Sequence, residues 1–195
     1  MRIIIIITLI LTQVSCTSSK KSFEKYDLEK GIITYSLKHP LKNNLIEQKV
    51  YFSNYGSTEF FEFVNEEDFP TFPIFKKDSL EYTFVSDSMT IKSERAPMTI
   101  FEKLVLKRDS KLFDKNLLIN KKTDTIIFDK KCKLIEFEIL ETGQNGKAAL
   151  WKGIPVWVNS QWEKGLYENI NLISLDLKSE IPIEKTKIMD YVDTE

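Results

Sequence analysis

Apolar and polar residues alternate along most of the chain after residue 30, and this period of two predicts β-strands. Ile33, Tyr35 and Leu37 fall on one face of a first strand. A second alternating run covers residues 46–52, and an aromatic run covers residues 59–64. Turn-forming residues separate the three runs, so they predict the start of an antiparallel meander.

Similar runs return later in the chain, and they make the protein mainly β. Residues 66–77 interrupt the pattern, because Pro70 and Pro73 stand there among aromatic side chains. Proline cannot donate a hydrogen bond to a sheet, so this segment is predicted to be a loop with apolar anchors and not a central strand. Residues 98–108 fit either a short amphipathic helix or another strand. The further strands are predicted at residues 81–85, 89–92, 135–139, 148–151 and 173–177.

The first residues have the three parts of an export signal. A basic Arg2 precedes an apolar run over residues 3–11, and a short exit with small residues ends at Cys16. Because a membrane-spanning helix needs roughly 20 apolar residues, this shorter run predicts a cleavable signal peptide.

The exit itself, Val14-Ser15-Cys16, resembles the lipobox of bacterial lipoproteins. The resemblance implies that Cys16 is lipidated and becomes the new amino terminus; an ordinary secretory signal with a chance cysteine is the alternative. The predicted organisation is a signal peptide at 1–15, a lipidated tether at 16–27 and one β-rich domain at 28–195. Thr17 is not the Asp that retains some lipoproteins in the inner membrane, and the tether has no acidic cluster of the kind associated with surface export. The expected location is therefore the outer membrane, facing the periplasm.

Charge and cysteine content limit the binding partners and the disulfides that this chain can have. The 28 basic and 29 acidic residues are balanced and interspersed, so no nucleic-acid partner is expected. Once Cys16 is lipidated, Cys132 has no second cysteine with which to form a disulfide, and it is predicted to be a buried, small apolar residue.

No arrangement of residues with usable spacing predicts an enzyme. The chain has no glycine-rich phosphate loop, no Cys/His pair with zinc spacing and no Gly-x-Ser-x-Gly elbow. The single histidine, His39, precedes a proline at an expected strand end, which disfavours a Cys132–His39 pair. A pair of carboxylates distant in sequence stays open as an alternative. We expect no catalytic residue, no metal site and no cofactor.

A meander of about eight strands leaves open edges unless the sheet curls, so a strongly curved sheet or partial barrel is expected. Four short segments, at residues 31–35, 50–57, 131–137 and 150–156, resemble small envelope lipoproteins related to the outer-membrane lipoprotein carrier LolA. The resemblance implies a single antiparallel sheet, bent into a half-barrel around an apolar hollow. One or two short helices or loops would cover its concave face.

Aromatic side chains are more numerous than a thin sheet easily hides, which favours binding of an apolar ligand in such a hollow. The predicted ligand-binding residues are Ile135, Phe137 and Ile139 on one strand, Phe72 in the proline-rich loop and Trp157 at the rim. Two functions stay open. The protein is either an anchored module that binds a lipid or another hydrophobic ligand, or an envelope scaffold whose sheet is filled by its own side chains.

Overall fold

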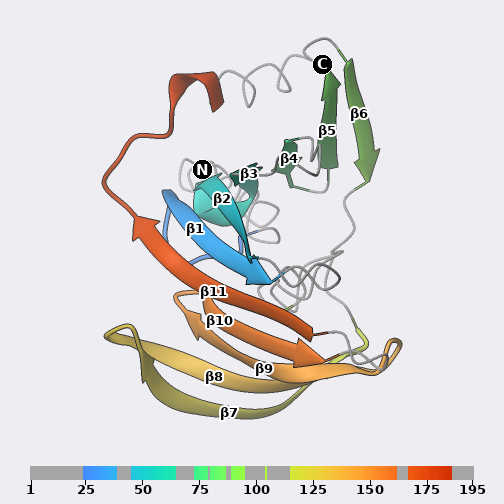
Figure 1. The fold of residues 1–195 in the computed structure, drawn as a ribbon, viewed down its shortest axis with the longest axis vertical. Helices are drawn as coiled ribbons and strands as arrows, with labels where there is room; N and C mark the ends of the chain where they lie inside the picture. Colours follow the sequence, from blue (N-terminus) through green and yellow to red (C-terminus); the bar gives the residue numbers. More distant parts are fainter. Residues whose placement is uncertain are drawn as a thin grey trace, which may run out of the picture.

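The strands form one open antiparallel sheet that bends strongly around its own concave face (Figure 1). The computed structural model describes residues 24–38, 45–64, 73–78, 80–86, 89–94, 104, 115–161 and 167–185. The sheet has eleven strands in the order β6-β5-β4-β3-β2-β1-β11-β10-β9-β8-β7, so β6 and β7 are its edges. The predicted fold class, a mainly β protein with a single curved sheet, is confirmed.

The strands are β1 Gly31–Lys38, β2 Leu45–Ser53, β3 Thr58–Val64, β4 Ile74–Lys77, β5 Leu80–Ser86, β6 Met89–Glu94, β7 Leu117–Ile127, β8 Lys130–Ile139, β9 Gln144–Trp151, β10 Ile154–Gln161 and β11 Tyr167–Asp176. A short 3-10 turn, η2 Asn54–Gly56, joins β2 to β3.

The predicted strands all occur, and the first three form the expected meander. The interpretation of residues 66–77 as a loop is wrong for its last part, because β4 pairs with both β3 and β5. Both prolines precede β4, so they do not interrupt its hydrogen bonds. Strands β7 and β10 were not predicted; β10 contains Pro155 next to an irregularity in its pairing with β9. Of residues 98–108 the structure describes only Leu104, which is helical and buried.

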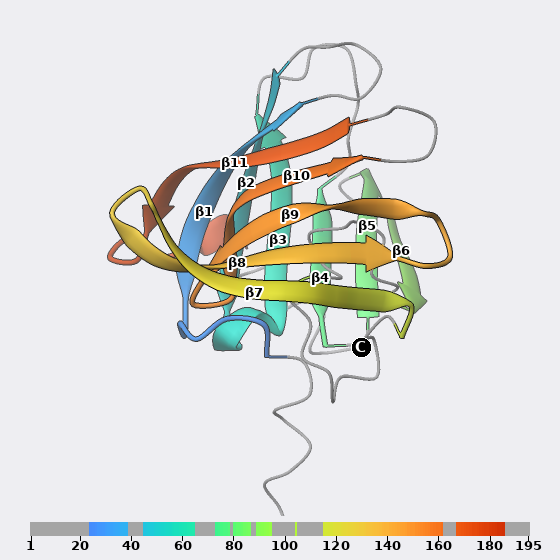
Figure 2. The same ribbon diagram turned by 90° about the horizontal axis from the view of Figure 1, so that it is seen from below.

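Antiparallel strands place alternate connections at opposite ends of the sheet, so the half-barrel has two rims (Figure 2). We name one of them the N-terminal rim. It carries η2, Asp78, the turn Phe128–Asp129, the turn Lys152–Gly153 and the first described residues, 24–30. The opposite, far rim carries the turn at residues 140–143.

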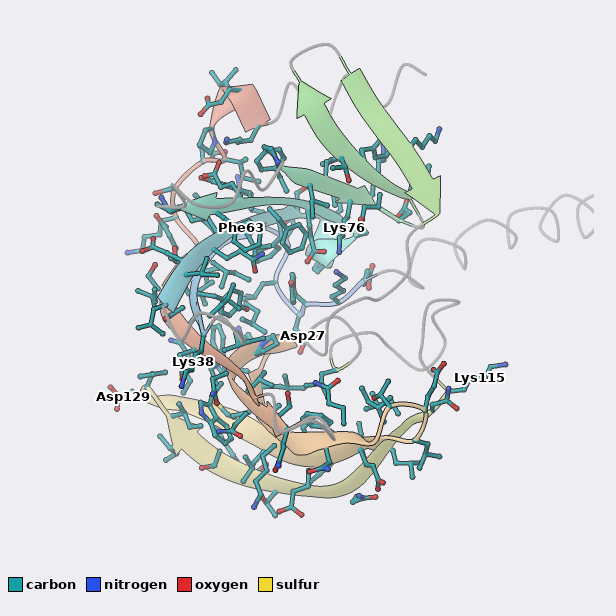
Figure 3. The ribbon with its side chains drawn as sticks, turned by 45° about the vertical axis from the view of Figure 1, so that its right-hand side comes forward. Asp27, Lys38, Phe63, Lys76, Lys115 and Asp129 are labelled. Carbon is teal, nitrogen blue, oxygen red and sulfur yellow. The ribbon has the colours of Figure 1, made fainter. Side chains whose placement is uncertain are left out.

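Two separate hydrophobic clusters pack on the sheet. The larger one fills the concave side, where it includes Tyr26, Phe52 and Phe137, and it extends to the other face of β9 through Ala149. The smaller one joins Tyr51, Phe60, Phe75 and Tyr82 on the convex side of β2–β5, where Ile181 packs against it. The amino-terminal segment therefore lies inside the curve, where Figure 3 labels Asp27, and the carboxy-terminal segment reaches the outside.

Candidate functional site on the concave face

An apolar belt crosses the concave face at right angles to the strands. It consists of directly paired residues on five successive strands, which therefore share one face of the sheet. Ile135 pairs with Ala148, Ala148 with Val158, Val158 with Ile170, and Ile170 with Leu37. Apart from Leu37, which is half-buried, each member is at most 2% exposed.

Three of the predicted ligand-binding residues lie together beside this belt or within it. Ile135, Phe137 and Ile139 alternate along β8 and point to the concave side, and all three are fully buried. Phe137 pairs with Gly146 of β9, where a Cβ atom would lie 2.2 Å from the carbonyl oxygen of Asn159. Glycine at this position thus permits a close approach of the β10 backbone.

The other two predicted residues do not join that group. Trp157 follows Val156 and precedes Val158 on β10, and its pairing with Ala149 places it on the face opposite to Val158. The sequence carried this signal, because Trp157 stands directly before Val158, and neighbouring residues of a strand point to opposite faces. Phe72 lies outside the described residues.

A buried ionic group was not predicted from the sequence. The ammonium group of Lys25 donates a hydrogen bond to Glu59, and both side chains are completely buried. The Tyr26 hydroxyl donates to the other carboxylate oxygen of Glu59 at 2.7 Å, and its ring lies edge-on to Phe52 at 4.7 Å. Glu59 falls in the alternation with Phe61 on β3, so its inward position was visible in the sequence as an acidic residue in an apolar row.

The polar row continues across the neighbouring strands. Glu59 pairs with Lys76 of β4, and Lys76 pairs with Glu81 of β5, with 3.3 Å between its nitrogen and that carboxylate. Burial, followed by the negative charge of Glu59, raises the pKa of the Tyr35 hydroxyl. Because buried charges are costly without partners, this row of alternating charge fixes the amino-terminal segment to β3.

This attachment bears on the predicted domain boundaries. Lys25 and Tyr26 fall within the predicted tether at 16–27, yet both are packed into the concave face. Their backbone N–H groups donate to the carbonyl of Tyr55, at 2.8 and 2.9 Å. The packed part of the chain therefore begins no later than residue 25.

A second attachment holds the carboxy-terminal segment on the convex face. Lys185 donates to Glu62 at 2.6 Å and lies 4.7 Å from the centre of the Phe60 ring. Tyr51 donates to the same carboxylate. Burial is the largest single influence on the pKa of Glu62 and raises it. The hydrogen bonds from Lys185 and Tyr51, together with the positive charges of Lys185 and Lys49, outweigh burial and lower the pKa.

Within the described residues, no group of three or more His, Cys, Asp or Glu side chains is arranged to hold a metal ion. Cys132 is buried, and burial raises the pKa of its thiol. Over the same part of the chain, no helix has the length and apolar character that a membrane crossing needs.

Comparison with known proteins identifies the class of fold. No protein-family model and no curated protein sequence matches this chain. An uncharacterized conserved protein from Thermus thermophilus shares the fold, with 8% identity over 85% of this chain and 88% of its own, and a TM-score of 0.53. MucB in the Pseudomonas aeruginosa MucA/MucB complex matches 85% of this chain with 56% of its own, at 10% identity and a TM-score of 0.52.

A LolA superfamily protein from Nitrosomonas europaea aligns with 85% of this chain and 93% of its own, at 9% identity and a TM-score of 0.45. The likeness to the Thermus thermophilus protein and to MucB shows a shared fold, and the predicted half-barrel, a single curved antiparallel sheet, is confirmed. At these identities the likeness concerns the fold alone.

Proposed function

We propose that this chain is a lipid-anchored envelope protein that binds a lipid or another hydrophobic ligand on the concave face of its half-barrel. Cys16 carries the anchor, the outer membrane receives it, and the domain faces the periplasm. The protein performs no catalysis. It acts by holding its ligand.

The apolar belt is the observation that supports ligand binding. It runs without a polar residue from Ile135 on β8 to Leu37 on β1, in a sheet that stays open between β6 and β7. An extended acyl chain laid across the strands would contact one apolar side chain at each strand, every 4.7–4.9 Å or so. Concave, mostly apolar surfaces of this kind are the usual sites for such ligands.

The burial of that same belt favours a second function, a scaffold that binds a protein partner. Ile135, Phe137 and Ile139 are already covered, and the amino-terminal segment occupies the concave face next to Phe52. A hydrophobic ligand would have to displace side chains that now fill this face. MucB, which shares the fold, was solved in complex with the protein MucA. A protein partner could instead bind outside the concave face.

Charge substitution on the concave face separates the two functions. The variants are Ile135→Glu, Phe137→Glu and Ile139→Glu, with Leu140→Glu as the matched control because Leu140 is exposed in the adjoining turn. Thermal stability and uptake of a fluorescent fatty acid are measured for each. Ligand binding is supported if the parent protein takes up the fatty acid and the three variants lose this uptake with only a modest loss of stability. No uptake by the parent, with a loss of about 4 kcal/mol or more in all three variants, supports the scaffold.

Anchoring is tested separately with Cys16→Ser. The variant should leave the membrane fraction or accumulate as precursor, and it should lose labelling by a fatty-acid analogue. Unchanged fractionation and labelling would refute the anchor. Protease treatment of intact cells tests the orientation, since ready digestion would indicate surface display.

A further inference from the structure

Three turns of the N-terminal rim carry side chains that folding alone disfavours. Phe128 and Asp129 both have positive φ, at 49° and 57°, in the two-residue turn between β7 and β8. Tyr55 and Lys152 also have positive φ, at 59° and 50°. Such positions favour Asn, Asp or Gly, and a bulky residue there is strained.

Packing does not explain the two aromatic residues at these turns. The Phe128 side chain is 60% exposed and that of Tyr55 is 41% exposed, so neither ring is buried in compensation for the backbone strain. Ile126, beside the Phe128 turn, is 74% exposed. Backbone strain at Phe128 and Tyr55 that no packing of their rings compensates indicates that these residues have a role other than folding.

The turn at Trp151, on the same rim, combines an aromatic ring with lysine side chains, as membrane interfaces do. Lys130 and Lys152 lie over the ring of Trp151, at 4.7 and 5.1 Å from its centre. Lysine extends its charge toward lipid headgroups while its methylene chain packs on apolar surface, and aromatic rings favour the depth of those headgroups. Phe128 follows at the tip of the same hairpin, and Ile126 lies on its other face, since Ile126 pairs with Lys131 while Ile127 pairs with Lys130.

The same rim carries the first residues that the structure describes. Asp27 donates its backbone N–H to the carbonyl of Lys152 at 3.0 Å, and Lys25 and Tyr26 donate to Tyr55. These hydrogen bonds join Tyr55, the amino-terminal segment and the turn after Trp151 into one surface. Residues 16–23 span at most about 30 Å even when fully extended, so the anchor keeps this rim close to the bilayer.

We propose that the N-terminal rim rests on the surface of the membrane that holds Cys16, with Phe128, Ile126 and Tyr55 inserted among the headgroups. This inference rests on the anchoring proposed above. The far rim and the opening of the half-barrel then face away from the bilayer. Figures 2 and 3 show the β7–β8 hairpin extending past the neighbouring strands, with Asp129 labelled at its tip.

The test uses the full lipidated chain in vesicles of phosphatidylethanolamine and phosphatidylglycerol. An environment-sensitive nitrobenzoxadiazole label is attached at Phe128→Cys or at Leu140→Cys. The two side chains are matched in exposure, at 60% and 57%, but lie on opposite rims. Cys132 is buried, and labelling of the parent chain measures its background. Thermal melting confirms that both variants fold.

We expect the label at position 128 to shift its emission to the blue and to be quenched by lipids brominated on their acyl chains, while the label at position 140 behaves as in water. Vesicle flotation reports anchoring independently. Chains that float with both labels in water would overturn the rim contact and leave the anchor intact, as would equal quenching at the two positions. Chains that do not float would refute the anchor, and the rim contact with it.

Discussion

Replacing Glu59 with Gln tests how strongly the amino-terminal segment is fixed to the sheet. The Lys25 and Glu59 side chains are both at 0% exposure, so the substitution leaves an ammonium group buried without its carboxylate. Removing one member of a buried ion pair costs about 3–5 kcal/mol, because the remaining charge has lost its solvation and its partner. A domain of ordinary stability has only about 5–15 kcal/mol in total.

Urea unfolding followed by tryptophan fluorescence measures the loss. With a slope of about 2 kcal/mol per molar, Glu59→Gln should lower the midpoint by about 2 M without changing the slope. Glu180→Gln is the matched control, because Glu180 pairs at 3.0 Å with Lys30 of the same segment, at the surface with 45% and 85% exposure. An exposed pair contributes at most about 1 kcal/mol, so the control should change little.

The double variant Lys25→Met, Glu59→Gln decides whether the loss comes from the uncompensated charge. Lys76 keeps Glu81 as a partner in that variant, so no other buried charge is created. We expect the double variant to be clearly more stable than Glu59→Gln alone. A loss below about 1 kcal/mol in the single variant, or no recovery in the double variant, would refute the reasoning.

Three further predictions concern other parts of the molecule. Gly153→Ala should lower the melting temperature by about 4–8 °C, because φ is 79° at this position and a Cβ atom would lie 2.3 Å from the carbonyl oxygen of Lys25. An unchanged melting curve would contradict that close contact. Hydrogen bonds from Ser179 and from the Lys178 backbone lower the pKa of Asp176 to about 2. The ionised carboxylate therefore stabilises its turn above the ordinary pKa of an aspartate, and this stabilisation is lost as the pH falls through about 2. In Ser179→Ala, an NMR titration should show a higher pKa for Asp176. An unaltered pKa would argue against the hydrogen bond from Ser179. Cys132, buried and with its pKa raised, should resist a maleimide in the folded protein and react once urea unfolds it, and rapid labelling of the native chain would place the thiol at the surface instead.

The alternation of apolar and polar residues along the chain determined much of this fold. Side chains of a strand point to opposite faces in turn, so residues such as Ile135, Phe137 and Ile139 reveal both the strand and its buried side without any knowledge of their neighbours. The number of strands and their open edges then required a curved sheet. The concave position of these three candidate residues was predictable for the same reason.

Contacts between distant segments were decided only by the tertiary structure. Lys25 and Glu59 are 34 positions apart, and neither residue alone indicates that it is buried with an opposite charge. Lys185 and Glu62 meet across 123 positions, because the carboxy-terminal segment passes to the convex face. Such pairs depend on the order of strands and on the path of the chain, which a periodic pattern does not encode. The sequence therefore determined which side chains face inward, whereas the tertiary structure decided which segments cover them, because covering requires long-range packing and a compensating partner for each buried charge.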